Sequence, residues 1–252
     1  MYMFGSGTLF GTQLTDAFGV AIANPSPIQF GTLQDVSIDI SGDVKELYGQ
    51  LQYPVAVGRG KGKVTCKAKM AGVNGLLFNS IFFGQTLTAG TYAAVYDTVG
   101  TIVPSTPFQI TPTIPGSGTF AADLGVINGT TGLAMTRVAS APATGQYSVA
   151  TGVWTFAAAD VGIRMFISYQ YTAASTVARR LTVQNLPMGY APTFRCDLTE
   201  SYAGKILTMT MNSCISTKLT IGSKQDDFWI PEFDFSAFAD SGNNVMSWGT
   251  SE

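Results

Sequence analysis

The sequence predicts an all-β protein with one flanking α-helix, and two observations carry this prediction. Apolar and polar residues alternate with a period of two in several segments, and Thr, Ser and Gly dominate the polar positions of the chain. A period of two places successive side chains on opposite faces of a strand. We therefore expect antiparallel sheets with one packed face and one polar face.

The alternation is clearest in three segments, residues 33–40, 62–70 and 194–199. Their polar positions, which should share one face of each strand, are Asp35, Ser37 and Asp39; Lys63, Thr65, Lys67 and Lys69; and Arg195, Asp197 and Thr199. A fourth segment, Lys205 to Ile221, is rich in Thr and apolar residues, which is typical of a long strand or a hairpin.

One segment has helical spacing. Between Val73 and Phe83, apolar residues recur every three or four positions, and Gly84 follows where a helix C-cap is expected. This pattern predicts a single amphipathic helix lying over a sheet.

The middle of the chain differs in composition from its flanks. From Gln85 to Ala174 charges are scarce, and short candidate strands are separated by turn signals such as Asn128-Gly129. Several short strands at this spacing predict a compact β-sandwich. We therefore expect a discontinuous core, residues 1–84 with 175–252, interrupted by an inserted β domain of residues 85–174.

Composition and charge limit the classes of function. Charged residues make up 12% of the 252 residues and the net charge is -2, so no basic surface for binding a phosphate backbone is indicated. The N-terminal residues lack the pattern of a secretory signal. The most apolar stretch, Val73 to Phe83, is too short to span a bilayer, so we expect no membrane partner.

The residues give little support for catalysis. The sequence has no histidine, which removes the commonest general base and most zinc sites. Cys66, Cys196 and Cys214 lie on the apolar side of alternating segments, as buried free thiols would. Acid pairs such as Asp226-Asp227 fit solvated acids better than a glycosidase or a calcium site. The sequence therefore predicts no enzyme, no cofactor and no metal.

Several stretches resemble phage tail tube proteins, the major tail protein family. The resemblance is carried by Gly31–Val55 with its Lys45-Glu46-Leu47-Tyr48-Gly49 motif, by Gly60–Ala68, by Phe82-Phe83-Gly84, and by Phe228–Asp240 at the C-terminal end. The stretches Gly145–Asp160 and Ile167–Tyr171 are similar to a β insert that recurs in phage tail proteins.

The resemblance implies a tail-tube-type β-sandwich or barrel that assembles into hexameric rings, which stack into a hollow tube for DNA. It implies a structural virion protein of the phage tail, assembled in the host cytoplasm. Its partners would be further copies of itself and other tail proteins, with DNA only transiently in the lumen. The inserted domain would project from the tube exterior.

Two sets of residues follow as candidates for such an assembly. We expect the ten polar positions named above to face the lumen, although ordinary solvent-facing positions would show the same pattern. We expect aromatic and apolar residues near the chain ends to contact neighbouring subunits, although they could instead pack on their own core. These are Leu9, Phe10, Phe228, Trp229, Ile230, Phe233, Phe235 and Phe238.

Three other functions stay open, in descending order of support. The chain could be the tube subunit of a contractile injection or secretion machine. The insert could make it a β-sandwich module that binds glycans or a cell surface. An enzyme is the least supported, because no acid–base constellation is present.

Overall fold

The computed structural model describes residues 2–72, 74–173, 178–223 and 225–251. It confirms the predicted fold class, since strands dominate and a single short α-helix is present among these residues. The chain divides into two compact units. The main unit comprises residues 1–86 and 181–252, and the insert comprises residues 87–180. The predicted first boundary followed residue 84, and the predicted second boundary, between residues 174 and 175, lies outside the described residues.

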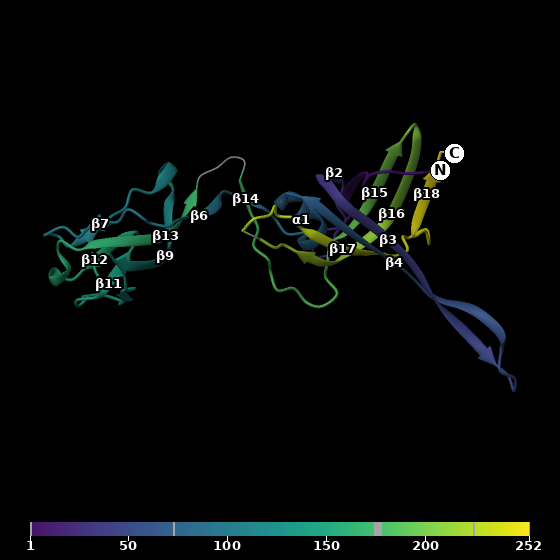
Figure 1. Cartoon of the computed structure of the whole chain (residues 1–252), viewed down its shortest axis with the longest axis horizontal. Coiled ribbons are helices and arrows are strands. Elements are labelled where there is room, and N and C mark those ends of the chain that lie inside the picture. Colours follow the sequence, from purple (N-terminus) through teal and green to yellow (C-terminus); the bar gives the residue numbers. More distant parts are fainter. Residues whose placement is uncertain (1, 73, 174–177, 224, 252) are drawn as a thin grey trace. The chain divides into compact units, whose positions relative to one another are not determined.

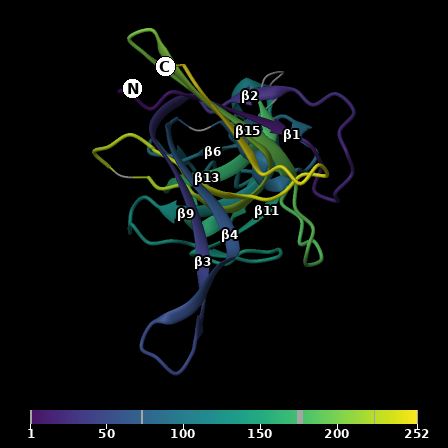
Figure 2. The same cartoon turned by 90° about the vertical axis from the view of Figure 1, so that its right-hand side faces the viewer.

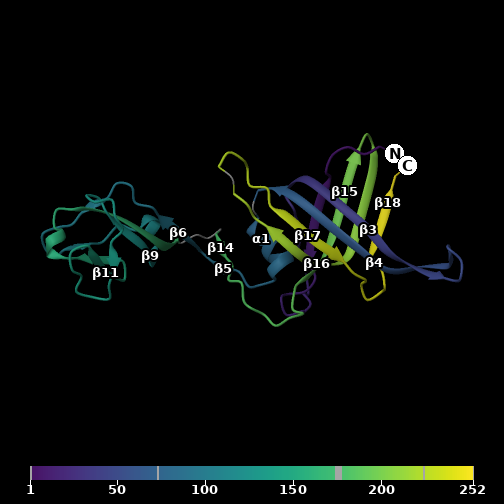
Figure 3. The ribbon, with the colours of Figure 1, turned by 60° about the horizontal axis from the view of Figure 1, so that its bottom comes forward.

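The main unit is built on one eight-stranded antiparallel sheet, ordered β2-β1-β15-β16-β17-β4-β3, with β18 also paired to β16 (Figures 1 and 3). Its strands are β1 (Thr8–Gln13), β2 (Pro27–Gln29), β3 (Thr32–Tyr48), β4 (Pro54–Ala71), β15 (Thr193–Tyr202), β16 (Lys205–Thr220), β17 (Glu232–Ala237) and β18 (Met246–Thr250). The segment from Lys205 to Ile221, for which the sequence allowed either a long strand or a hairpin, forms the single long strand β16.

The core of the main unit lies on one face of this sheet. Phe194, Phe233 and Phe235 form its centre, with ring centroids 5.4 to 6.1 Å apart. Cys66, Ala68 and Met70 of β4 and Met211 and Cys214 of β16 extend this apolar layer across neighbouring strands. The alternation in the sequence therefore identified the packed face correctly on β4 and β15.

A β-bulge changes the phase of β3. The period of two in residues 33–40 predicts that Leu33 shares a face with Asp35, but Leu33 is buried in the core and Asp35 is exposed. The register shifts between these two residues, so that an extra residue is accommodated in β3 opposite β4. The polar face of β3 consequently begins at Asp35.

The predicted helix is present but is not a single regular helix. It consists of α1 (Gly75–Phe78) and a π-helical turn, η1 (Asn79–Phe83), and Val73 lies outside the described residues. Gly84 ends it in the left-handed conformation, as predicted, and a Cβ there would meet the backbone nitrogen of Ala17 at 2.6 Å. Leu77, Phe78 and Ile81 of this segment are buried, whereas Leu76, which helical spacing would place on the same side, is exposed.

The insert contains two four-stranded sheets and a two-stranded ribbon. Its elements are β5 (Thr88–Ala89), β6 (Thr91–Val95), β7 (Thr101–Ile102), β8 (Gln109–Ile110), η2 (Pro115–Ser117), β9 (Thr119–Asn128), β10 (Thr136–Arg137), β11 (Gln146–Ala150), β12 (Val153–Phe156), η3 (Ala158–Asp160), β13 (Arg164–Ala173) and β14 (Arg179–Arg180). β5 and β14, through which the chain enters and leaves the insert, pair with each other.

Sequence reasoning missed the ten-residue strand β9 of the insert. Its sequence includes Ala121-Ala122-Asp123 and Gly125, which break the alternation of apolar and polar residues. The pairing of β9 with β13 accordingly shows two register shifts, one of them beside Gly125. The long partner strand β13 supplies the hydrogen bonds that the local sequence pattern does not predict.

Candidate assembly surfaces

All ten residues that the sequence suggested for a lumen share one face of the main sheet, opposite the core. On β3 and β4, Asp35 pairs with Lys69, Ser37 with Lys67, and Asp39 with Thr65. On β15, Arg195, Asp197 and Thr199 alternate with three residues of the core. The sheet therefore brings together polar residues that lie more than 150 positions apart in the sequence; we call this surface the polar face.

Further polar residues complete the polar face between these groups. Glu232 of β17 pairs with Lys69, and Asp234 of β17 pairs with both Lys67 of β4 and Lys218 of β16. The sequence analysis missed these because it treated the segment around Glu232 as aromatic residues near the chain end and assigned no face to the strand from Lys205 to Ile221. The period of two within Glu232–Ala237, with Phe233 and Phe235 as the apolar positions, could have indicated that Glu232 and Asp234 lie on the polar face.

Charges of opposite sign are balanced on the polar face. The residues named so far on this face, together with Lys63 and Lys218, include five cations and five carboxylates. The cations are Lys63, Lys67, Lys69, Arg195 and Lys218, and the carboxylates are Asp35, Asp39, Asp197, Glu232 and Asp234. The Lys69–Asp35 contact of 3.8 Å joins two well-exposed side chains, so it contributes little to stability. Within this set of ten residues, positive and negative charges are equal in number.

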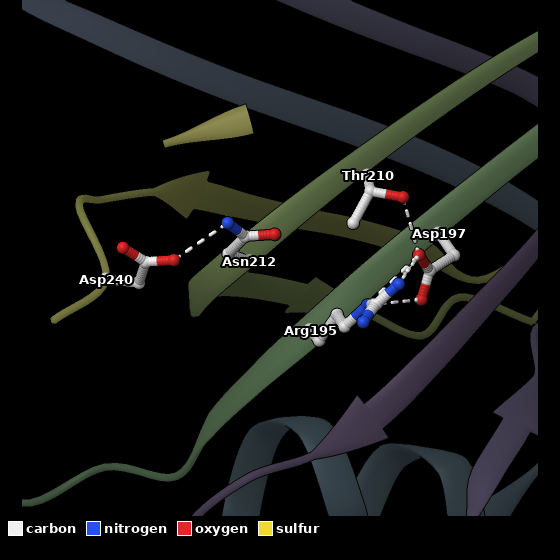
Figure 4. Close-up of polar contacts among 5 residues, drawn as sticks. All are labelled: Arg195, Asp197, Thr210, Asn212 and Asp240. Atoms are coloured by element: carbon white, nitrogen blue, oxygen red, sulfur yellow. Dashed lines mark hydrogen bonds and ion pairs between the residues drawn. The ribbon is translucent and has the colours of Figure 1, made fainter. Parts of the chain in front are cut away.

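The most ordered part of the polar face is a cluster on β15 and β16 (Figure 4). Arg195 donates to both carboxylate oxygens of Asp197, with distances of 2.8 Å from Nη2 and 2.9 Å from Nε, and Thr210 donates to Asp197 at 2.7 Å. These bonds to Asp197 raise the pKa of Arg195. The cluster therefore holds a planar charged pair flat against neighbouring strands.

A second polar contact in Figure 4 fixes the turn that follows β17. Asn212 of β16 donates to Asp240 at 2.8 Å, and the other oxygen of Asp240 accepts from the backbone N–H groups of Gly242 and Asn244. The bond from Asn244 is the largest cause of a lowered pKa at Asp240. The turn is thus tied to β16 before the chain continues into β18.

Three of the eight residues expected at subunit contacts are corrected by the structure. Leu9, Phe233 and Phe235 are buried in the core of their own unit, with at most 1% of each residue exposed. The pairings of β1 with β15 and of β17 with β4 and β16 turn these side chains inward. They cannot contact a neighbour unless the unit unfolds. Phe10, Phe228, Trp229, Ile230 and Phe238 are exposed and remain candidates.

The structure adds a surface that the sequence analysis did not assign. β3 and β4 continue past the rest of the sheet as a hairpin, whose outer part spans residues 44–57 (Figures 1 and 2). We call this part the hairpin arm. Its exposed apolar residues are Val44, Leu47, Tyr48, Leu51, Tyr53, Val55 and Val57. Such a concentration of exposed apolar residues on a monomer marks an interaction surface.

Unpaired strand edges accompany the hairpin arm. β17 pairs with β4 only from Val64 to Lys69, and within the described residues no strand pairs with that edge of β4 from residue 54 to 63. The outer edge of β3 likewise has no partner strand in the described parts of the chain. Free edges of this length invite pairing with another chain.

A groove of about 600 Å³ lies between the base of the hairpin and β18. It is lined on one side by Ile40 and Val64 and on the other by Phe238 and Met246, with Arg59 and Lys63 at its margin.

The three cysteines are buried free thiols, as predicted. Burial raises the pKa of Cys66 to about 12 and raises the pKa values of Cys196 and Cys214 as well. Neutral, inaccessible thiols are poor nucleophiles. Within the described residues, no group of three or more Cys, Asp or Glu side chains is placed to hold a metal ion.

No helix in the described ranges has the length and apolar character needed to cross a membrane. Comparison with protein-family models gives no match, and a search of curated proteins also finds none.

Proposed function

We propose that this chain is a structural subunit that assembles into stacked hexameric rings forming the hollow tail tube of a phage, through which DNA passes. The observation that carries the proposal is the hairpin arm with its adjoining free strand edges. These features suit a chain that is completed by other copies of itself, because symmetric assembly converts hazardous edges into interfaces.

The balance of charges on the polar face supports the proposal that this face lines the lumen. Each phosphate that a cation neutralises adds affinity for DNA, so a conduit must avoid an excess of positive charge. The polar face meets this requirement because its five cations are matched by five carboxylates, one pair of which, Arg195 with Asp197, is held by direct hydrogen bonds. DNA would then pass without stable binding.

In this proposal the chain is not an enzyme and needs no cofactor. The absence of histidine from the sequence and the raised pKa values of the three thiols agree with a purely structural role. The insert would project from the tube exterior, and the virion would be the site of the assembled protein.

Electron microscopy of the purified protein over a range of concentrations, together with its mass in solution, tests the proposal. We expect rings or hollow tubes of uniform width. Leu47→Glu in the hairpin arm should prevent their formation, because it places a charge in an apolar interface. Leu124→Glu, at a similarly exposed leucine of the insert, is the matched control and should assemble normally.

A wild-type chain that stays monomeric at every concentration would contradict self-assembly. A density map of the tube would test the lumen assignment separately. If the ten polar candidates lay on the exterior of the tube, the polar face would not line the lumen.

A further inference from the structure

The segment between β16 and β17 presents an exposed acidic and aromatic loop, residues 225–230. Asp226 and Asp227 supply its charge, and Phe228, with 88% of its surface exposed, projects beside the half-exposed Trp229. The end of β4 holds the base of this loop, because the N–H groups of Met70 and Gly72 donate to the carbonyls of Pro231 and Trp229. The loop thus displays a large aromatic side chain from an anchored backbone.

The groove described above has complementary properties. Its walls are apolar, and Phe238 and Ile40 leave much of their surface open to it. Arg59 and Lys63 stand at its margin, and neither forms an ion pair with any described residue. The nearby carboxylate of Asp240 is already satisfied by Asn212 and by backbone N–H groups. The groove therefore offers apolar volume next to Arg59, which forms no ion pair with a described residue.

The loop and the groove lie at opposite ends of β17, a strand that can be followed in Figure 3. The loop precedes Glu232, and the groove begins at Ala237 and Phe238. A strand of this length spans roughly 20 Å, so the loop of one chain cannot enter its own groove. A second copy can supply the loop, and the contact that results is head-to-tail, which generates rings or stacks.

We propose that the loop of one copy docks in the groove of the next, with Phe228 as the apolar anchor and Asp226 facing Arg59. This inference rests on the proposed self-assembly and specifies one of its contacts. A large aromatic side chain that fills an apolar pocket is typical of the energetic centre of an interface. About 600 Å³ is ample for a phenylalanine side chain with part of its loop.

Disulfide trapping between two variants of the full chain tests the contact. Chains carrying Phe228→Cys are mixed with chains carrying Phe238→Cys under mild oxidation. We expect a disulfide between positions 228 and 238 of different chains, identified by mass spectrometry. The same bond cannot form within one chain, because a disulfide requires Cα atoms less than about 7 Å apart. The three native thiols are buried and do not compete.

Controls define the outcomes of the trapping experiment. Tyr96→Cys, at an exposed aromatic residue of the insert, should not link to Phe238→Cys. If Leu47→Cys of the hairpin arm links to position 238 and Phe228→Cys does not, the groove receives the hairpin arm and the inference is wrong. Absence of any link to position 238 also overturns it.

A second measurement separates this inference from the proposed function. Phe228→Ala should raise the protein concentration needed for assembly roughly 30-fold or more, as loss of an interface anchor does, whereas Tyr96→Ala should not. Tubes that form equally well with Phe228→Ala and show no 228–238 link would leave the proposed function standing and refute the docking contact. A 228–238 link in a protein that never forms rings would support the docking contact and refute the proposed function.

Discussion

The two units of this protein handle polar groups in opposite ways. The insert buries charge: the Asp123 side chain is 4% exposed and accepts hydrogen bonds from Tyr147 at 2.6 Å and Trp154 at 3.0 Å. In the described residues of the main unit, the buried polar side chains are neutral, namely Asn79, Ser80 and Ser213. None of its charged residues is fully buried, although one oxygen of Asp234 is, and many of them lie on the polar face.

This difference shows two ways in which a chain with few charges can use them. A carboxylate that is fully hydrogen-bonded inside a core specifies one arrangement of its neighbours, which suits a small unit that must hold its shape by itself. Charges and apolar side chains left on a sheet surface and a hairpin arm suit a unit that is completed by partners. Substitutions in each unit, with unfolding followed separately for the two units, test whether they behave independently.

The largest effect is expected from Phe233→Ala in the main unit. This side chain is fully buried among Phe30, Phe194 and Phe235, so its loss should lower the free energy of unfolding by about 3–5 kcal/mol. Urea denaturation followed by the fluorescence of Trp248 measures it in a chain with Trp154→Phe and Trp229→Phe. Phe228→Ala is the control and should change stability by no more than about 0.5 kcal/mol. Equal effects of the two variants would contradict the assigned core.

A smaller effect is expected from Asp123→Ala in the insert. The buried donors of Tyr147 and Trp154 would lose their acceptor, which should cost about 1–3 kcal/mol. The fluorescence of Trp154, in a chain with Trp229→Phe and Trp248→Phe, reports the unfolding of the insert alone. The transition of the main unit should not move. If both transitions shifted together, the two units would not be independent.

A still smaller and pH-dependent effect is expected from Asp240→Asn in the main unit. The folded state lowers the pKa of Asp240 below its ordinary value of 3.8, so the charged form stabilises the fold above about pH 4. That contribution is lost as the pH falls through the lowered pKa. The melting temperature of the variant should therefore lie slightly below that of the wild type at pH 7, and the difference should disappear on acidification. A difference that grows in acid would refute the assignment.

No effect on the main unit is expected when the insert is removed. β5 and β14 pair at the base of the insert, so the two chain ends to be rejoined lie next to each other and a short glycine linker can bridge them. A chain lacking residues 87–180 should keep the main-unit unfolding transition and, under the proposed function, should still form rings. Loss of the fold in this variant would show that the insert supports the main unit.

Local patterns predicted much of the fold. Alternation in residues 62–70 and 194–199 identified the buried and polar sides of β4 and β15, and Gly84 marked the end of the helical segment. β9 was missed because it pairs with β13 through register shifts near Gly125, and a local sequence pattern does not predict such shifts. Leu33 was placed on the wrong face because a bulge adds a residue opposite β4.

The same contrast applies to the candidate surfaces. The sequence identified the polar positions of the main sheet, because a period of two is a local property of a strand. It could not separate the buried Phe233 from the exposed Phe228, since both lie in one aromatic segment and only strand pairing decides which side chains turn inward.

By itself, the sequence determined the fold class, an inserted unit with few charges, and the polar positions of β3, β4 and β15, since these depend on composition and on residues close together in the chain. Only the tertiary structure decided which strands become neighbours, and therefore which charges balance across them, which apolar hairpin is left exposed, and where a groove opens. These features depend on contacts between residues far apart in the sequence, and hydrophobic burial selects those contacts over the whole unit rather than within any one segment.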